Sequence, residues 1–103
     1  MIEMKNRSDI EVMASILSSA SRKWEYKTTI MYNACISHSQ LIRYLNIVLE
    51  KGLIEYSEEY GRYKTTGKGL KFLEKYLQLL KLLPNLPDTQ DFEMEKEKIN
   101  QIT

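Results

Sequence analysis

The chain has 103 residues, of which 43% are hydrophobic and 28% are charged, and these values predict one small globular domain with an appendage at most. No apolar run approaches the ~18 residues that cross a bilayer, and no signal-peptide pattern opens the chain, so a cytoplasmic protein is expected. One cysteine, Cys35, and one histidine, His38, exclude an internal disulfide and do not suffice for a protein-only metal site. The sequence therefore predicts no metal and no other cofactor.

The charge is distributed unevenly, although the net charge is only +1. Residues 1–83 hold 13 Lys and Arg against 9 Asp and Glu, whereas residues 84–103 hold 2 against 5. A mildly basic body with an acidic tail is compatible with a polyanionic partner, but does not require one.

Two short helices are predicted first. Ser8 and Glu11 form a capping box, and the apolar spacing that follows predicts a helix over about residues 9–22. Its inward side should consist of Ile10, Met13, Ile16, Leu17 and Ala20. Residues 27–34 predict a second helix, although two threonines there also suit extended chain. Its inward residues should be Ile30, Met31 and Ala34.

A third helix begins after Ser37, where Gln40 completes another capping box. Its apolar stripe, expected to face the core, consists of Leu41, Leu45, Val48 and Leu49. Gly52 supplies the left-handed residue that ends the helix. Cys35, in the turn before this helix, is expected to be a small buried residue.

A hairpin and a long helix complete the predicted fold. Residues 53–57 alternate as a strand does, residues 58–61 suit a turn, and residues 62–65 form the return strand. Thr66 caps the last helix, which Pro84 ends. This order predicts a mostly helical α+β fold, a winged helix-turn-helix. It divides into a winged domain over 1–66, a C-terminal dimerisation helix over 67–84 and an acidic tail over 85–103, whose composition is compatible with a flexible segment.

The outer side of the third helix is polar. With the apolar stripe buried, the residues left outside or at its flank are His38, Ser39, Gln40, Arg43, Asn46 and Ile47. In a helix-turn-helix this side enters the major groove of DNA, where Gln can contact adenine and Arg can contact guanine. A solvated surface helix with a capped start would show the same pattern, so both interpretations stay open. Tyr44 flanks the stripe and is expected at the edge of the core.

Cations lie on and near the wing. Arg62 and Lys64 alternate with Tyr63, so both lie on one face of the strand, and Lys27 lies near the start of the second helix. Such cations suit phosphate contacts, but a charged edge strand also resists aggregation. Glu58 and Glu59 at the tip of the wing argue against deep insertion into a groove.

The last helix carries more apolar surface than one small domain can cover, which favours a homodimer joined through this helix. The candidate dimerisation residues are Leu73, Tyr76, Leu77, Leu80 and Leu83. The alternative is that this helix only closes the core of its own domain.

Motifs of enzymes are absent from the sequence. It contains no Gly-rich phosphate loop, no nucleophile elbow, and no HExxH or CxxC pattern. Cys35 and His38 are three residues apart but lack a third orienting group. The sequence therefore predicts a protein that is not an enzyme.

The pattern Ser-x-x-Gln-Leu-x-x-Tyr-Leu from Ser37, the Gly-Leu-Ile that begins at Gly52, and Tyr-Lys-Thr-Thr-x-Lys-Gly from Tyr63 together resemble archaeal winged-helix DNA-binding regulators. Within them, the chain is most similar to the small dimeric "ten-a" type proteins of Sulfolobus. The resemblance covers about residues 8–83 and implies a homodimer joined by an antiparallel coiled coil, with the third helix and the wing on DNA. It places at the DNA surface Ser39, Gln40, Arg43 and Ile47, with Arg62 and Lys64 on the wing.

We therefore expect a homodimeric protein that binds double-stranded DNA, either a transcriptional regulator or a nucleoid-associated chromatin protein. It should not bind membranes. The alternative is a winged helix used only for contacts between proteins, which the near-neutral charge and the acidic wing tip favour. A ligand-sensing regulator is a third possibility, for which the sequence marks no pocket.

Overall fold

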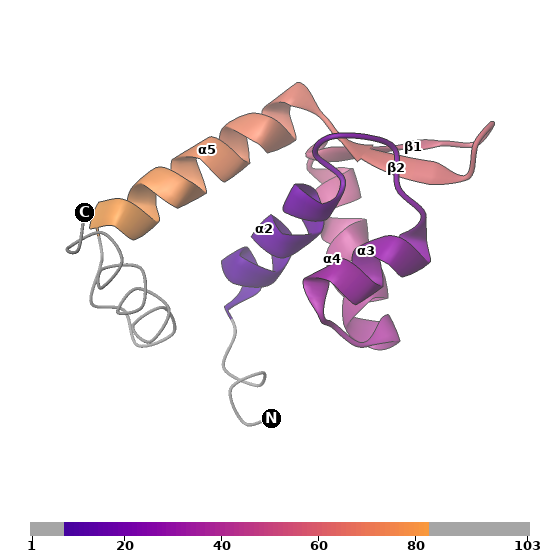
Figure 1. Cartoon of the computed structure of the whole chain (residues 1–103), viewed down its shortest axis with the longest axis horizontal. Helices are drawn as coiled ribbons and strands as arrows, with labels where there is room; N and C mark the ends of the chain where they lie inside the picture. Colours follow the sequence, from indigo (N-terminus) through magenta and orange to yellow (C-terminus); the bar gives the residue numbers. More distant parts are fainter. Residues whose placement is uncertain (1–7, 83–103) are drawn as a thin grey trace, which may run out of the picture.

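The structure is a computed structural model that describes residues 8–82. In chain order its elements are α2 (Asp9–Ser19), α3 (Lys27–Ala34), α4 (His38–Glu50), β1 (Ile54–Ser57), β2 (Arg62–Thr65) and α5 (Gly67–Leu82). Helices α2, α3 and α4 cluster together, the hairpin projects to one side of them, and α5 extends away on the other side (Figure 1). The predicted order and the mostly helical winged helix-turn-helix fold are confirmed.

The three predicted N-terminal caps are present. The Ser8 hydroxyl accepts the Glu11 N–H at 3.1 Å, and the Thr66 hydroxyl accepts the Gly69 N–H at 3.1 Å. At α4 the capping box is reciprocal, because Ser37 accepts the Gln40 N–H at 3.2 Å while the Gln40 side chain accepts the Ser37 N–H at 3.0 Å. These bonds satisfy backbone donors that a helix start leaves free.

One helix end departs from the prediction. Helix α2 ends at Ser19 and not at residue 22, because the Ala20 carbonyl accepts the N–H of Thr65 at 2.9 Å and so pairs with the wing. Helix α3 ends at Ala34, as predicted, and Cys35 follows it in a left-handed conformation with φ 57°. The prediction that Cys35 is buried is wrong, because its neighbours Ala34 and Ile36 fill the interior and the cysteine is exposed.

The wing is an antiparallel pair in which Ile54 lies opposite Thr65 and Ser57 lies opposite Arg62. Gly61 closes its turn with φ 64°. A third segment that pairs with this sheet was not predicted. Glu25 pairs with Tyr63, and each backbone N–H donates to the other residue's carbonyl at 2.8 Å. The segment before α3 is thus tied to the outer edge of β2.

The core lies between α2, α3, α4 and the base of the wing. Its fully buried large side chains are Val12, Ile16, Leu17, Ile30, Leu41 and Val48. The predicted stripe of α2 was partly wrong, since Ile10 is 48% exposed while Val12 and Ala14 are buried. Helix α2 packs against α3, α4 and α5, so its buried surface is wider than one stripe.

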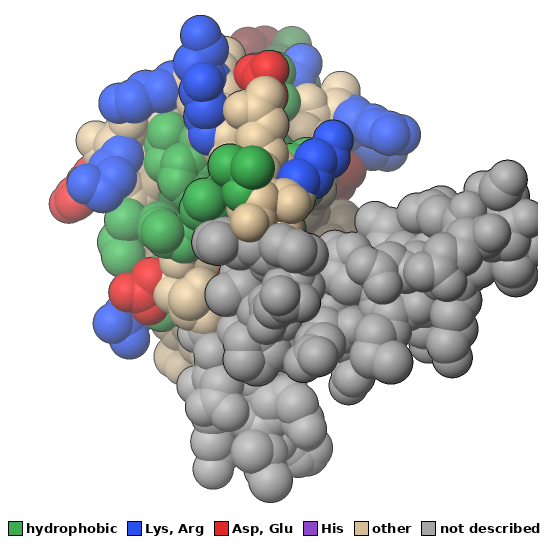
Figure 2. Space-filling view, turned by 90° about the vertical axis from the view of Figure 1, so that its left-hand side faces the viewer, with side chains coloured by type: hydrophobic (Ala, Val, Ile, Leu, Met, Phe, Trp, Pro, Cys, Tyr) green, Lys and Arg blue, Asp and Glu red, His purple; other side chains and the backbone are tan. Residues whose placement is uncertain are grey.

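Helix α5 closes the core with its first turns only. Phe72 and Leu73 pack against the core cluster, whereas Leu77 is 56% exposed. Figure 2, a view toward this end of the molecule, shows hydrophobic side chains gathered together and bordered by Lys and Arg. None of the helices within residues 8–82 is both long and apolar enough to cross a membrane.

Candidate nucleic-acid interface

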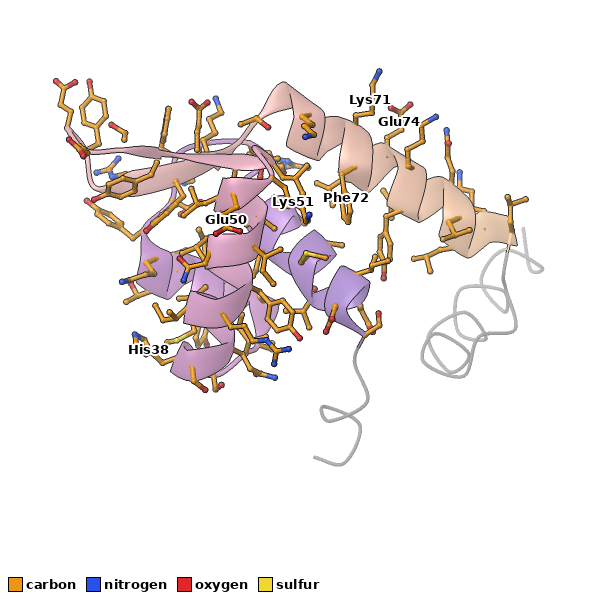
Figure 3. The ribbon with its side chains drawn as sticks, turned by 180° about the vertical axis from the view of Figure 1, so that it is seen from behind. His38, Glu50, Lys51, Lys71, Phe72 and Glu74 are labelled. Carbon is orange, nitrogen blue, oxygen red and sulfur yellow. The ribbon has the colours of Figure 1, made fainter. Side chains whose placement is uncertain are left out.

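The outer side of α4 is open to solvent. Leu41, Leu45 and Val48 are buried as predicted, and Leu49 is half-buried. The side chains left exposed on the opposite side are His38, Ser39, Arg43 and Asn46. His38 projects at the start of the helix, and Glu50 and Lys51 lie at its other end (Figure 3). The exposed side of α4 therefore carries side chains that can form hydrogen bonds in its first turns and a carboxylate, Glu50, at its end.

Gln40 is held by the cap of its own helix. Its side-chain Oε1 accepts the Ser37 N–H at 3.0 Å and lies 3.3 Å from the Ser37 hydroxyl. A bidentate contact with adenine needs both the oxygen and the amide nitrogen of this side chain. The Gln40 side chain would have to leave the capping box to make that contact, whereas the Arg43 side chain is already exposed and needs no such change.

Tyr44 anchors α4 to the start of α2. The tyrosine is buried, and its hydroxyl donates to the Asp9 carboxylate at 2.6 Å. This hydrogen bond, followed by burial and the negative charge of Asp9, raises the pKa of Tyr44, while the positive charge of Arg43 lowers it. The Arg43 guanidinium carbon lies 5.2 Å from the Tyr44 ring centroid. Arg43 therefore projects from a part of α4 that the Tyr44–Asp9 hydrogen bond holds in place.

Two isoleucines border this polar side. Ile42 is 36% exposed, and Ile47 is half-buried against the core. Ile42 was not among the predicted site residues. Its position off the apolar stripe could have indicated that it lies on the exposed side of the helix. An exposed aliphatic side chain on a recognition helix suits the methyl group of thymine.

The three predicted cations outside α4 are all half-buried. Lys27 begins α3, and Lys64 lies opposite Glu55 in the strand pair. Arg62 donates from Nη2 to the Tyr26 hydroxyl at 2.7 Å, and its guanidinium carbon lies 4.5 Å from the centre of the Tyr26 ring. No sequence pattern identifies Tyr26 as the partner of Arg62, because the two residues are 36 positions apart.

The turn of the wing is acidic and aromatic. Glu58, Glu59 and Tyr60 are exposed there, and the Ser57 hydroxyl accepts the Tyr60 N–H at 3.2 Å. The wing thus presents its cations along strand β2 and its carboxylates at the tip. This arrangement suits contacts along a phosphate backbone better than insertion of the tip into a groove.

A groove of about 440 Å³ runs along the contact between α2 and α5. Helix α2 contributes Glu11, Ala14, Ser15 and Ser18 to its walls, and α5 contributes Leu73, Tyr76, Leu77 and Leu80. Four of the five predicted dimerisation residues thus converge on one surface. The fifth, Leu83, and the predicted tail over 85–103 lie outside the described residues.

Metal-ligand types do not gather in the part of the chain that the structure describes. Between residues 8 and 82, no three His, Cys, Asp or Glu side chains are placed so that they could hold a metal ion. The chemistry available at the outer side of α4 and on the wing is hydrogen bonding and charge.

Comparison with known proteins finds similar folds. The chain is similar to Sso10a-2, a DNA-binding protein from Sulfolobus solfataricus, with 22% identity, a TM-score of 0.68, and coverage of 93% of this chain and 96% of that one. It is also similar to a MarR-family transcriptional regulator from Silicibacter pomeroyi, with 20% identity, a TM-score of 0.52, and coverage of 89% and 69%. No curated protein sequence matches the chain.

The similarity to Sso10a-2 confirms, at the level of the fold, the relation to archaeal winged-helix proteins that the sequence predicted. The model of the winged helix-turn-helix family matches residues 6–83, which is most of the chain. This match includes all the helices and both strands described above. The chain therefore belongs to the winged helix-turn-helix family.

Proposed function

We propose that this protein is a homodimeric DNA-binding regulator that acts without catalysis. The observation that carries the proposal is the open polar side of α4, which has Arg43 at its centre and lies in a fold that commonly uses this helix to read DNA. The two similar structures are described as a DNA-binding protein and a transcriptional regulator, which supports the same role.

In the proposed mechanism, α4 enters the major groove and the wing lies along the backbone. Arg43 recognises guanine through its two-pronged guanidinium, while Ser39 and His38 contact bases or phosphate beside it. Ile42 contacts a thymine methyl group. Lys27, Arg62 and Lys64 bind phosphates, which supplies affinity that is independent of sequence and sensitive to salt.

The dimer is proposed to form through α5. Beyond the turns that cover the core, this helix keeps Leu77 exposed and lines the groove beside α2 with Tyr76 and Leu80. A second copy of α5 would cover these side chains. Two-fold symmetry would then place two α4 helices on one duplex.

The test is fluorescence anisotropy with a labelled duplex and the Arg43→Ala variant. Loss of a bidentate base contact should weaken binding about tenfold for a preferred sequence. Arg43→Lys, which keeps the charge and removes the fork, should recover only part of this loss. Lys71→Ala removes one charge from a side chain that points away from the body (Figure 3), and should change affinity less than about twofold. Unchanged affinity in Arg43→Ala would contradict the assignment of α4 as the reader.

The acidic tip of the wing favours a second candidate, a winged helix that binds another protein. Glu58 and Glu59 are exposed there and would be repelled by phosphate. This candidate gains support if the wild-type protein fails to bind duplex DNA even at low salt.

A further inference from the structure

We infer that Tyr26 is a positioning residue for nucleic-acid binding, because it holds the Arg62 guanidinium ready for a backbone phosphate. The inference rests on the proposed function and names a residue that sequence reasoning did not place in the site. It concerns how the wing is set against the helix-turn-helix, and it predicts that the effects of Tyr26 and Arg62 on affinity depend on each other.

The contact between the two side chains combines two interactions. The guanidinium carbon of Arg62 lies 4.5 Å from the centre of the Tyr26 ring, and Nη2 donates to the ring's hydroxyl at 2.7 Å. Stacking on an aromatic face and a hydrogen bond at the same ring restrict a side chain that is otherwise long and flexible. Binding a phosphate then requires less ordering of Arg62, which raises affinity.

The backbone around Tyr26 is fixed as well. Glu25 makes two hydrogen bonds of 2.8 Å with Tyr63, the neighbour of Arg62 on β2. The Tyr26 carbonyl accepts the Ile30 N–H at 3.0 Å as α3 begins. Tyr26 therefore stands where the wing meets the first helix of the helix-turn-helix, so its contact with Arg62 sets the wing relative to α3 and α4.

The remaining donors of Arg62 point to an anion. A guanidinium has five N–H groups, and Tyr26 takes one of them. Nε of Arg62 is buried and has no hydrogen-bond partner among the described residues. Burying an N–H without a partner is unfavourable, and the stacking and hydrogen bond with Tyr26 offset part of this cost. Arg62 itself is only half-buried, which leaves the N–H groups of Nη1 and the second N–H of Nη2 for the fork geometry that suits phosphate.

The other charged side chains of the wing are less suited than Arg62 to bind a phosphate. Lys64 lies opposite Glu55 in the strand register, and a cross-strand pair of opposite charges attracts. Glu58 and Glu59 lie at the turn. A phosphate that approaches the wing is therefore expected to meet Arg62 at the Tyr26 side, away from the tip.

A double-mutant cycle on the full chain tests the inference, with duplex affinity measured over a range of salt concentrations. Arg62→Ala should weaken binding and reduce the salt slope by about one, as expected for one lost phosphate contact. Tyr26→Ala should weaken binding about three- to tenfold when Arg62 is present, and should have almost no effect in the Arg62→Ala background. Tyr26→Phe keeps the ring and should recover part of the loss.

The controls separate this inference from the proposed function. Tyr26 is half exposed, so its variants should fold, which circular dichroism checks. If Arg43→Ala weakens binding but Tyr26→Ala weakens it equally in both Arg62 backgrounds, the inference is wrong while the proposed function stands. Tighter binding by Tyr26→Ala would also overturn it, because the contact would then withhold Arg62 from DNA. Failure of the wild-type protein to bind duplex DNA overturns both.

Discussion

The hydroxyl of Tyr44 connects α4 to a residue 35 positions earlier in the chain. Its acceptor is the Asp9 carboxylate, at the first residue of α2. A hydrogen bond to a charged acceptor is stronger than a neutral one, and the buried ring lies between the two helices. One residue on the inner side of α4 thus fixes the angle at which its outer side is presented.

Replacing Tyr44 with Phe should lower the free energy of unfolding by about 1–2 kcal/mol, because the ring stays and the hydrogen bond is lost. The raised pKa of Tyr44 adds a pH dependence. The folded protein holds this proton more tightly than the unfolded chain, so the contribution is complete below about pH 10 and declines as the pH rises through the raised pKa. Urea unfolding at neutral pH and at about pH 10.5 measures both effects.

Tyr60→Phe is the matched control for Tyr44→Phe, because Tyr60 is exposed on the turn of the wing. It should leave stability unchanged at neutral pH. The role assigned to the Tyr44 hydroxyl would be refuted if both variants were as stable as the wild-type protein. Burial also raises the pKa of Tyr63, so some alkaline destabilisation should persist without the Tyr44 hydroxyl.

Cys35 is the one non-glycine residue between positions 8 and 82 that adopts a positive φ. Its N–H donates to Tyr32 at the end of α3, and the Ile36 N–H donates to Met31, which completes the helix terminus. Cys35→Gly should stabilise the fold by about 0.5–1 kcal/mol, because glycine adopts this conformation without steric strain. Thermal unfolding measures the gain, and Cys35→Ser, which keeps the β-carbon, should show none of it.

At the scale of elements, the start of α5 is fitted closely against the wing. A β-carbon on Gly69 would overlap the Leu53 carbonyl and lie 2.5 Å from a methyl group of Thr65. The Thr65 hydroxyl in turn donates to the Leu17 carbonyl at 2.6 Å. Glycine at this position therefore lets α5 approach the hairpin and the end of α2.

Gly69→Ala should destabilise the protein by about 1–3 kcal/mol through overpacking, although alanine is the better helix former. Gly67→Ala is the control, because a β-carbon there meets nothing within 4 Å, and it should be neutral or slightly stabilising. Chemical denaturation of both variants gives the comparison. Equal stabilities would show that α5 can shift away from the wing without loss.

Local signals explain which elements the sequence predicted well. The caps at Ser8, Ser37 and Thr66 and the turn at Gly61 depend on neighbours in the chain, so residue type and spacing were enough. Two contacts join distant segments of the chain and follow no spacing rule. They are the pairing of Glu25 with Tyr63 and the contact of Tyr26 with Arg62. The capping box at Gln40 was also predicted, and its side-chain oxygen accepts the Ser37 N–H as that motif requires.

At the scale of the whole molecule, the apolar side of α5 continues past the part that covers the core. Leu77 is 56% exposed beside the groove with α2, whereas Leu82 is 76% exposed on a different side of the helix. Five residues at 3.6 per turn separate the two by more than a right angle. A partner helix in the groove would therefore cover Leu77 and leave Leu82 in solvent.

This geometry predicts opposite outcomes for two otherwise equivalent substitutions. Light scattering should give the wild-type protein twice the mass of the 12.2 kDa chain, and Leu77→Glu should give the monomer, because a buried unpaired carboxylate opposes association. Leu82→Glu should remain dimeric. Since a monomer presents one α4 to the duplex, Leu77→Glu should also bind DNA more weakly while its helical content is unchanged. A dimeric Leu77→Glu protein would place the interface elsewhere and would remove the reason for assigning the α2–α5 groove to a second copy.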